Sequence, residues 1–154
     1  MKSFDEIYGA LKQYRGVDIY DRFYDDKKRR FPKKYRQDVL GTLKYSDIYK
    51  AYNGYRYNIN INTIVDSDTM FARRVFELLY AKTIVVSNYS RGLINYFGDT
   101  VISTDDTKEM IQKLEYINAS EKNYFDFIEK GYNRITQKEL YIHRIEQIKK
   151  VLYE

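Results

Sequence analysis

Two arginines and a glutamate that could form a nucleotide site lie close together near the middle of the chain, at Arg73, Arg74 and Glu77. In nucleotide-binding α/β folds a carboxylate can accept hydrogen bonds from both ribose hydroxyls, because it offers two oxygens to two adjacent donors. A guanidinium near a helix N-terminus suits a phosphate or diphosphate. The alternative from spacing alone is that one arginine is solvated and the other pairs with Glu77 along the helix.

The elements that must position these side chains are predicted from the pattern between Tyr57 and Gly92. Residues 57–63 are β-prone and bounded by turn residues, which predicts a strand. Residues 70–81 carry apolar side chains at spacings of three and four without glycine or proline, which predicts a helix, N-capped from residues 67–69. The β-branched run at residues 83–87 predicts a second strand, buried on both faces.

The order strand, helix, strand predicts two parallel strands joined by a right-handed crossover. Ligands of such sheets bind beyond the carboxyl ends of the strands and at helix N-termini. The candidate binding residues lie at the strand ends, around the start of the helix and in the turn after the second strand. They are Asn60, Asn62, Asp66, Ser67, Thr69, Arg73, Arg74, Glu77, Ser90 and Gly92. No spacing of acidic residues marks a catalytic pair, so no catalytic residue is assigned.

Composition narrows the class of protein further. A length of 154 residues predicts one domain, 1–154. The absence of cysteine excludes a disulfide framework and a thiolate zinc site, and a single histidine argues against a histidine metal site. We expect no metal and no cofactor. No apolar run approaches the ~20 residues that cross a bilayer, and no signal peptide opens the chain, so we expect a cytoplasmic protein without a transmembrane segment.

A cluster of positive charge, the basic segment, runs from Lys27 to Arg36 around the only proline. Basic side chains interleaved with aromatic ones can contact nucleic acid through phosphates and stacking. Five acidic residues between Asp18 and Asp38 dilute this charge, which makes a nucleic-acid partner unlikely. The plain interpretation is a solvated loop on an α/β domain.

The rest of the chain alternates between strand and helix patterns and then becomes helical. Strands are predicted at residues 17–20, 39–43 and 100–103, and helices at residues 3–14, 46–52 and 93–97. A C-terminal helical tail is predicted at residues 106–117, 121–133 and from Thr136 onward, with Leu140, Ile145, Ile148 and Leu152 facing inward. This order predicts a Rossmann-like α/β domain with a parallel sheet of about four strands and a helical tail.

The stretch DSDTMFARRVFELLYAKTIVVSNYSRG, with NININ before it, resembles the donor-binding C-terminal half of GT-B glycosyltransferases. The most similar group is that of the group 1 and spore-maturation-type glycosyltransferases. The residues that match its turn, helix and strand end are Asp66, Ser67, Thr69, Arg74, Phe76, Glu77 and Ser87. The resemblance implies a three-layer Rossmann-like lobe that binds a nucleotide-diphosphate sugar as substrate.

Three departures from that family pattern bear on function. Related retaining enzymes carry a first glutamate where this chain has Thr69, and a small glycine where it has Lys82, in a turn where glycine would relieve strain. The chain also has length for one lobe only, without a first strand or an acceptor lobe. We therefore expect glycosyl transfer only together with an acceptor lobe. The alternative is a non-enzymatic α/β binding module whose basic segment, Lys27 to Arg36, contacts an anionic polymer or nucleic acid.

Overall fold

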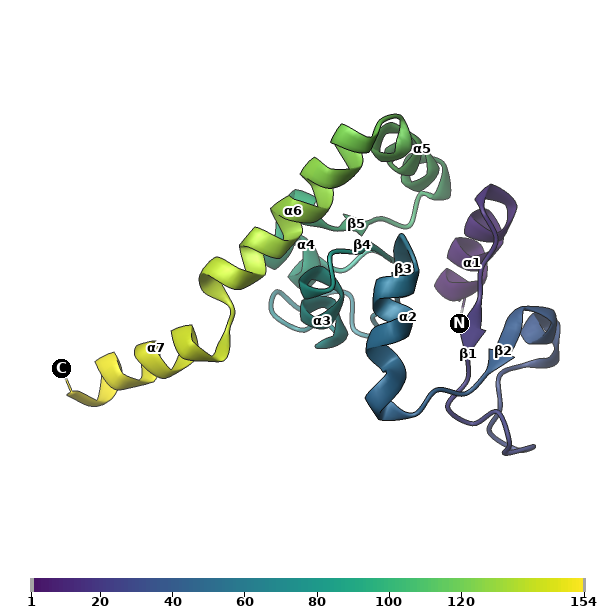
Figure 1. Ribbon diagram of the computed structural model, residues 1–154, viewed down its shortest axis with the longest axis horizontal. Helices are drawn as coiled ribbons and strands as arrows, with labels where there is room; N and C mark the ends of the chain where they lie inside the picture. Colours follow the sequence, from purple (N-terminus) through teal and green to yellow (C-terminus); the bar gives the residue numbers. More distant parts are fainter. Residues whose placement is uncertain (1, 154) are drawn as a thin grey trace.

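The computed structural model describes residues 2–153, and side chains from residue 4 on (Figure 1). The strands are β1 (Ile19–Tyr20), β2 (Val39–Gly41), β3 (Tyr57–Asn60), β4 (Ile84–Ser87) and β5 (Ile102–Ser103). The α-helices are α1 (Lys2–Tyr14), α2 (Ile48–Gly54), α3 (Arg74–Tyr80), α4 (Arg91–Phe97), α5 (Thr107–Asn118), α6 (Glu121–Lys138) and α7 (Tyr141–Tyr153). Short 3-10 turns lie at Lys33–Asp38, Tyr45–Asp47 and Gly98–Thr100.

The strands form two parallel sheets. The larger sheet has the order β3-β4-β5, and β1 pairs with β2 in a separate sheet of two strands. The predicted parallel pairing of the strand at Tyr57 with the strand that ends at Ser87 is confirmed, with Tyr57 opposite Ile84 and Asn60 opposite Ser87. The expected single sheet of about four strands is wrong, because β1 and β3 do not pair among the residues described.

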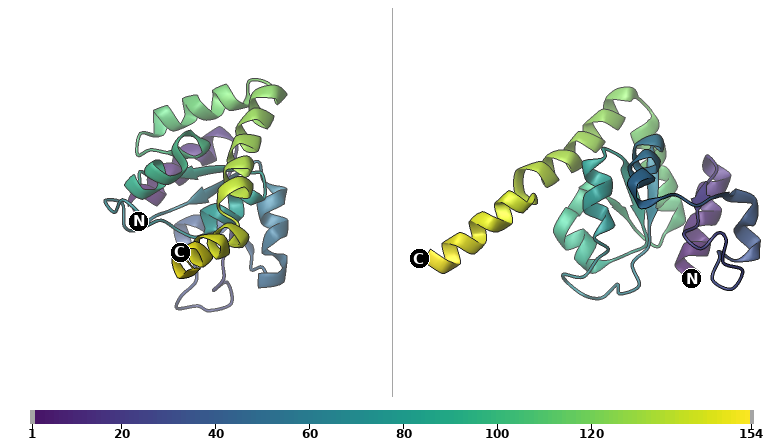
Figure 2. Two further views of the ribbon diagram at one scale, coloured as in Figure 1. Left: turned by 90° about the vertical axis from the view of Figure 1, so that its left-hand side faces the viewer. Right: turned by 60° about the horizontal axis from the view of Figure 1, so that its bottom comes forward.

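Helices cover both faces of the larger sheet, as the two further views show (Figure 2). Alternate residues of β4 point to opposite faces: Ile84 and Val86 pack with α1 and α5, whereas Val85 packs with α3 and α4. Helix α6 crosses from one layer to the other, with Ile128 in the first core and Ile135 in the second. This arrangement confirms the predicted Rossmann-like α/β fold.

Helix α3 begins later than the sequence predicts. The expected helix from Met70 starts at Arg74, and no side chain caps its N-terminus. Instead, the hydroxyl of Ser67 accepts hydrogen bonds from the amides of Thr69 and Met70, so the expected capping residues stabilise a turn in the loop before the helix. Polar side chains that bond to nearby amides compete with helix formation, which explains the shorter helix.

The helical tail is present, but its last helix differs from the prediction. Thr136 lies inside α6, where its hydroxyl donates to the carbonyl of Tyr132, and it does not open a new helix. Helix α7 projects away from the domain (Figure 1), so three of the four residues expected to face inward are exposed: Ile145, Ile148 and Leu152 have 48%, 58% and 69% of their surface accessible. The fourth, Leu140, precedes α7 and is half-buried against the second core, as expected. The single histidine, His143, accepts a hydrogen bond from the Leu140 amide through Nδ1.

Lys82, in the turn between α3 and β4, has a left-handed backbone conformation with φ of 54°. It is the one non-glycine residue with positive φ among residues 2–153. Its side chain offsets part of the strain, because the ammonium contacts Glu129 and lies 4.4 Å from the centre of the Tyr132 ring. The resemblance noted above places glycine at this position.

Two substitutions at Lys82 separate these effects. Lys82→Ala removes the side-chain contacts and keeps the strained φ, whereas Lys82→Gly removes the same contacts and relieves the strain. We therefore expect Lys82→Gly to be more stable than Lys82→Ala by about 1 kcal/mol, measured as the free energy of unfolding in urea. Equal stabilities would contradict a strained turn.

Candidate functional site

Polar residues end all three strands of the larger sheet at the same edge. Asn60 on β3 lies opposite Ser87 on β4, which lies opposite Ser103 on β5. The Ser87 hydroxyl is fully buried and accepts hydrogen bonds from the side-chain amides of Asn60 and Asn62, at 3.2 and 3.1 Å. Buried polar groups are costly unless they are paired, so this cluster holds the strand ends in one arrangement.

The loop of residues 61–73 is tied to the carboxyl edge of the sheet at both of its ends. At its start, the Asn62 amide donates to Asn88 Oδ1 (2.8 Å) and Asn88 Nδ2 donates to the Asn62 carbonyl (3.0 Å). At its end, the Ala72 amide donates to Asn62 Oδ1 (2.9 Å). One of the predicted binding residues, Asn62, thus shapes the loop with its side chain and backbone, and Asn60 ties the end of β3 to Ser87.

The middle of this loop approaches the start of α4, which Ser90 caps and where Gly92 lies. The Ser90 hydroxyl caps α4 by accepting from the Leu93 amide. Gly92 is buried, and a Cβ atom there would lie 3.0 Å from the carbonyl oxygens of both Ser67 and Met70. A side chain is excluded by this close approach of two backbone segments.

The outer surface of the loop carries an exposed cluster of charge. Asp66 and Asp68 lie on either side of Arg91, at 3.9 and 3.6 Å from its guanidinium nitrogens. Thr69 is exposed beside them in the sequence. Arg91 was not among the predicted site residues, and its pairing with the loop aspartates is a property of the folded chain.

Glu77 is held at the start of α3 by two neighbours. One carboxylate oxygen pairs with the Arg73 guanidinium at 3.1 Å, which raises the pKa of Arg73, and the other accepts from the Tyr52 hydroxyl at 3.4 Å. Burial raises the pKa of Tyr52, so its hydroxyl stays protonated and can donate. The alternative weighed above, in which one arginine pairs with Glu77, therefore describes Arg73. Arg74 is exposed and has no ion pair within residues 2–153.

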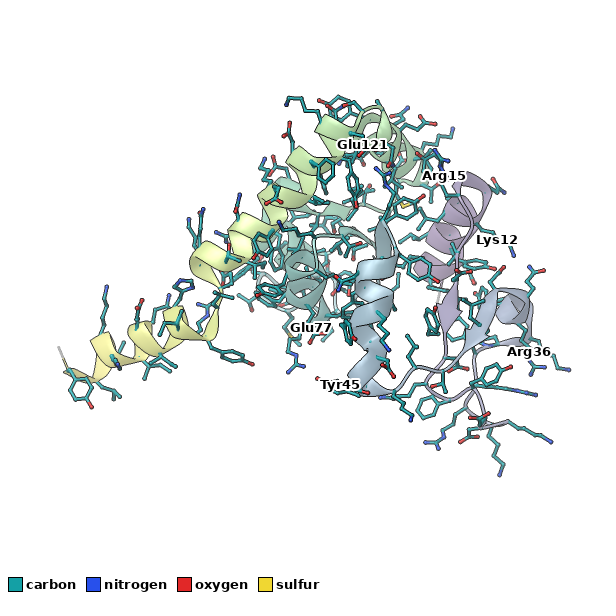
Figure 3. The ribbon with its side chains drawn as sticks, in the orientation of Figure 1. Lys12, Arg15, Arg36, Tyr45, Glu77 and Glu121 are labelled. Carbon is teal, nitrogen blue, oxygen red and sulfur yellow. The ribbon has the colours of Figure 1, made fainter. Side chains whose placement is uncertain are left out.

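A cleft of about 1060 Å³ lies between the β1–β2 sheet and the β3 edge of the larger sheet. Its charged lining residues are four arginines and one carboxylate, and most of the remainder is aromatic or aliphatic. The charged residues are Arg15, Arg22, Arg56, Arg74 and Asp18. Two lining residues, Arg15 at the end of α1 and Tyr45 ahead of α2, lie far apart in Figure 3, so the cleft is elongated.

The cleft is lined mainly by the segments that lead into β1 and β3, by residues of these two strands and by α2. The loop of residues 61–73, which follows β3, does not line it. Of the predicted site residues, Arg74 lines the cleft. Glu77 touches it through Tyr52, which is a lining residue.

The predicted site residues divide into four groups. Asn60 and Ser90 bond to Ser87 and to the start of α4, respectively, whereas Asn62 and Gly92 contact the loop itself. Asp66 and Thr69 lie on the exposed surface of the loop with Ser67 half-buried between them, and Arg73, Arg74 and Glu77 lie by the cleft. Sequence reasoning omitted Asn88 and Tyr52. Asn88 directly follows a buried strand, so the rule that ligands bind beyond the carboxyl ends of parallel strands could have identified it. Tyr52 lies 25 residues from Glu77, and only the fold brings the two side chains together.

The structure is that of a Rossmann-like α/β protein with a cleft whose charged lining is mostly arginine. The chain belongs to the glycosyl transferase-like family, whose model matches residues 5–150. The resemblance noted in the sequence is thus confirmed at the level of the family. No curated protein and no solved structure matches the chain.

Two classes of feature are missing from the part of the chain that the structure describes. Within residues 2–153, no helix combines the length and the apolar character needed to span a membrane. The same residues include no grouping of three or more histidine, aspartate or glutamate side chains that could hold a metal ion.

The close approach at Gly92 gives a test of the loop geometry. In Gly92→Ala, the new Cβ displaces the loop backbone, so we expect the free energy of unfolding to fall by about 1–3 kcal/mol. Gly9→Ala is the matched control, because nothing lies within 4 Å of a Cβ there. Gly9 lies within α1, so its substitution should be neutral or stabilise by about 0.5–1 kcal/mol. Equal effects of the two substitutions in urea titrations would contradict this geometry.

Proposed function

We propose that this chain binds the nucleotide-diphosphate sugar donor of a glycosyl transfer reaction in the arginine-lined cleft. The observation that carries the proposal is the excess of four arginines over one carboxylate in a cleft of about 1060 Å³. This volume is slightly above the usual range of small-molecule sites, ~300–1,000 Å³, and suits an extended ligand with a charged centre. Membership of the glycosyl transferase-like family supports glycosyl transfer as the reaction.

Arg74 is the proposed diphosphate contact. It is exposed in the cleft, and it has no ion pair among the residues described, so its guanidinium fork is available for phosphate oxygens. Its neighbour Arg73 is engaged with Glu77. Guanidinium groups bind phosphate in a two-pronged geometry that an ammonium group cannot provide, which favours arginine at this position.

Glu77 is the proposed ribose contact. Arg73 and Tyr52 each use one of its oxygens and fix the orientation of the carboxylate. An ionised carboxylate has about four acceptor sites on its two oxygens, so it can accept two ribose hydroxyls as well. The tyrosines that line the cleft, among them Tyr20, Tyr45 and Tyr52, offer aromatic surface for the base and hydroxyls for the sugar.

We further propose that this domain is the donor-binding lobe of a two-lobe GT-B arrangement. The polar side chains at the carboxyl edge of the sheet are bonded to one another and to the loop, whereas the arginines that line the cleft could bind a diphosphate. A glycosyl acceptor would then be held by another lobe, in the same or a separate chain.

Donor binding is tested by calorimetry with nucleoside diphosphates and the matching nucleosides. We expect Glu77→Ala to weaken diphosphate binding by about 2–4 kcal/mol, because two charge-assisted hydrogen bonds to the ribose are lost. Arg74→Gln should weaken binding of the diphosphate and leave nucleoside binding unchanged, because it removes a phosphate contact only.

Glu115→Ala is the matched control for these variants. Glu115 is exposed on α5, away from the cleft. The control should bind as the wild type does, Arg74→Gln and Glu115→Ala should keep the wild-type melting temperature, and Glu77→Ala should still unfold cooperatively. If Glu77→Ala keeps full affinity while it remains folded, the ribose role is wrong.

Turnover tests the assignment to a single lobe. Holding donor and acceptor in reactive geometry contributes roughly 7–11 kcal/mol to catalysis, and a donor lobe supplies only part of it. We expect residues 1–154 alone to bind donor sugars but to release nucleoside diphosphate from them far more slowly than ~1 per second. A rate typical of a complete enzyme, measured on this chain without any other protein, would contradict the proposal.

A further inference from the structure

We propose that the basic segment, Lys27 to Arg36, is a binding surface for a linear polyanion with repeating phosphate groups, recognised by charge without base stacking. The segment carries seven basic residues and no acidic one. Since the whole chain has a net charge of +5, the residues outside the segment sum to −2. All of the excess positive charge of the protein therefore lies in this segment.

The exposed cations of the segment are free for a partner. Lys27, Lys28, Lys33 and Arg36 are exposed and have no ion pair within residues 2–153. Figure 3 shows Arg36 pointing outward, on the opposite side of α2 from Glu77. Lys34 pairs with Asp5, and Arg29 pairs with Asp26. A surface with several unpaired cations binds polyanions through the release of their counterions.

Two of the five acidic residues that flank the segment, Asp21 and Asp38, make contacts elsewhere in the fold. Asp21 is buried, and its two oxygens accept hydrogen bonds from the amides of Phe23 (2.8 Å) and Phe31 (2.6 Å). Asp38 is engaged by Lys12 and by Tyr8. These carboxylates hold the chain on either side of the segment in a defined shape, so little ordering is needed when a partner binds.

The aromatic residues of the segment pack against each other and against α1, which bears on the class of polyanion. Tyr35 is 2% exposed, and Phe31 packs edge-on against it and against Phe4 of α1. Single-stranded nucleic acids are held by exposed aromatic side chains on which the bases stack. Tyr35 is buried and Phe31 is half-buried with its ring packed on Tyr35 and Phe4, so the fully exposed side chains of the segment are mainly cations, which suit phosphates better than bases.

The basic segment adjoins the cleft, because Phe31 and the nearby Arg22 are both lining residues. A polymer bound to the segment would therefore run past the mouth of the cleft. That this polymer is also the glycosyl acceptor rests on the function proposed above, but the binding itself does not.

The test measures binding of inorganic polyphosphate to the full chain by fluorescence anisotropy at several salt concentrations. In the segment variant, Lys27, Lys28, Lys33 and Arg36 are all changed to glutamine. We expect affinity to fall at least about tenfold at low salt, and the slope of log K against log[salt] to drop by roughly 0.7 for each cation removed.

The matched control removes the same charge elsewhere, by changing Lys44, Lys108, Lys149 and Lys150, all exposed, to glutamine. It should bind polyphosphate within about threefold of the wild type, because counterion release depends on the cations that touch the polymer. Equal weakening in both variants would show a net-charge effect and overturn the proposal. Absence of polyphosphate binding by the wild type would overturn it as well.

Two further ligands separate the classes of partner. Tighter binding to an RNA oligonucleotide, or to vesicles of phosphatidylcholine and phosphatidylserine, than to polyphosphate would assign the surface to nucleic acid or to a membrane and would overturn the proposal. Nucleoside diphosphate binding is measured in the same variants. The affinity for nucleoside diphosphate should be unchanged, since none of the substituted residues lines the cleft. If the wild type fails to bind nucleoside diphosphate, the proposed donor site is wrong, and this result is independent of polyphosphate binding.

Discussion

The buried hydroxyl of Ser87 is the contact on which the arrangement of the site depends. It lies at the end of the central strand and accepts hydrogen bonds from the side-chain amides of Asn60 and Asn62, which belong to the end of the neighbouring strand and the start of the loop. Asn88 continues the cluster through two hydrogen bonds to the backbone of Asn62. Each of these groups would cost free energy if it were buried without a partner, so the cluster forms as a unit or not at all.

This cluster determines where the loop goes, and the loop determines where α3 begins. Because Asn62 also accepts from the Ala72 amide, the chain before α3 is drawn back over the sheet edge. The helix then starts at Arg74, with Arg74 at the cleft and Glu77 fixed by Arg73 and Tyr52. Asn62, which the sequence predicts as a ligand contact, therefore has a structural role: it fixes the backbone of the loop before α3.

The positive charge of the protein is concentrated on two neighbouring surfaces, the cleft and the basic segment. Four arginines line the cleft, and seven basic residues form the adjacent basic segment, while the carboxylates of Asp21 and Asp38 are directed into backbone and side-chain contacts. Fields of one sign across neighbouring surfaces raise the local concentration of anionic ligands. A protein with a modest net charge can therefore present a strongly cationic face.

The sequence by itself determined the fold class and the parallel pairing of the strands at Tyr57 and Ser87, because hydrophobic periodicity encodes them. It also indicated the family, through the resemblance of the stretch from Asp66 to Gly92 to glycosyltransferases. Local pattern failed where long-range contacts compete with it. The start of α3 moved because Ser67 and Asn62 use the amides before it, and the apolar stripe of α7 is exposed because that helix leaves the domain. Three features join residues that are distant in the chain: the cleft, the contact of Tyr52 with Glu77, and the hydrogen bonds of the buried Asp21 to the amides of Phe23 and Phe31. Only the tertiary structure decided them, since no local spacing specifies which distant side chains meet.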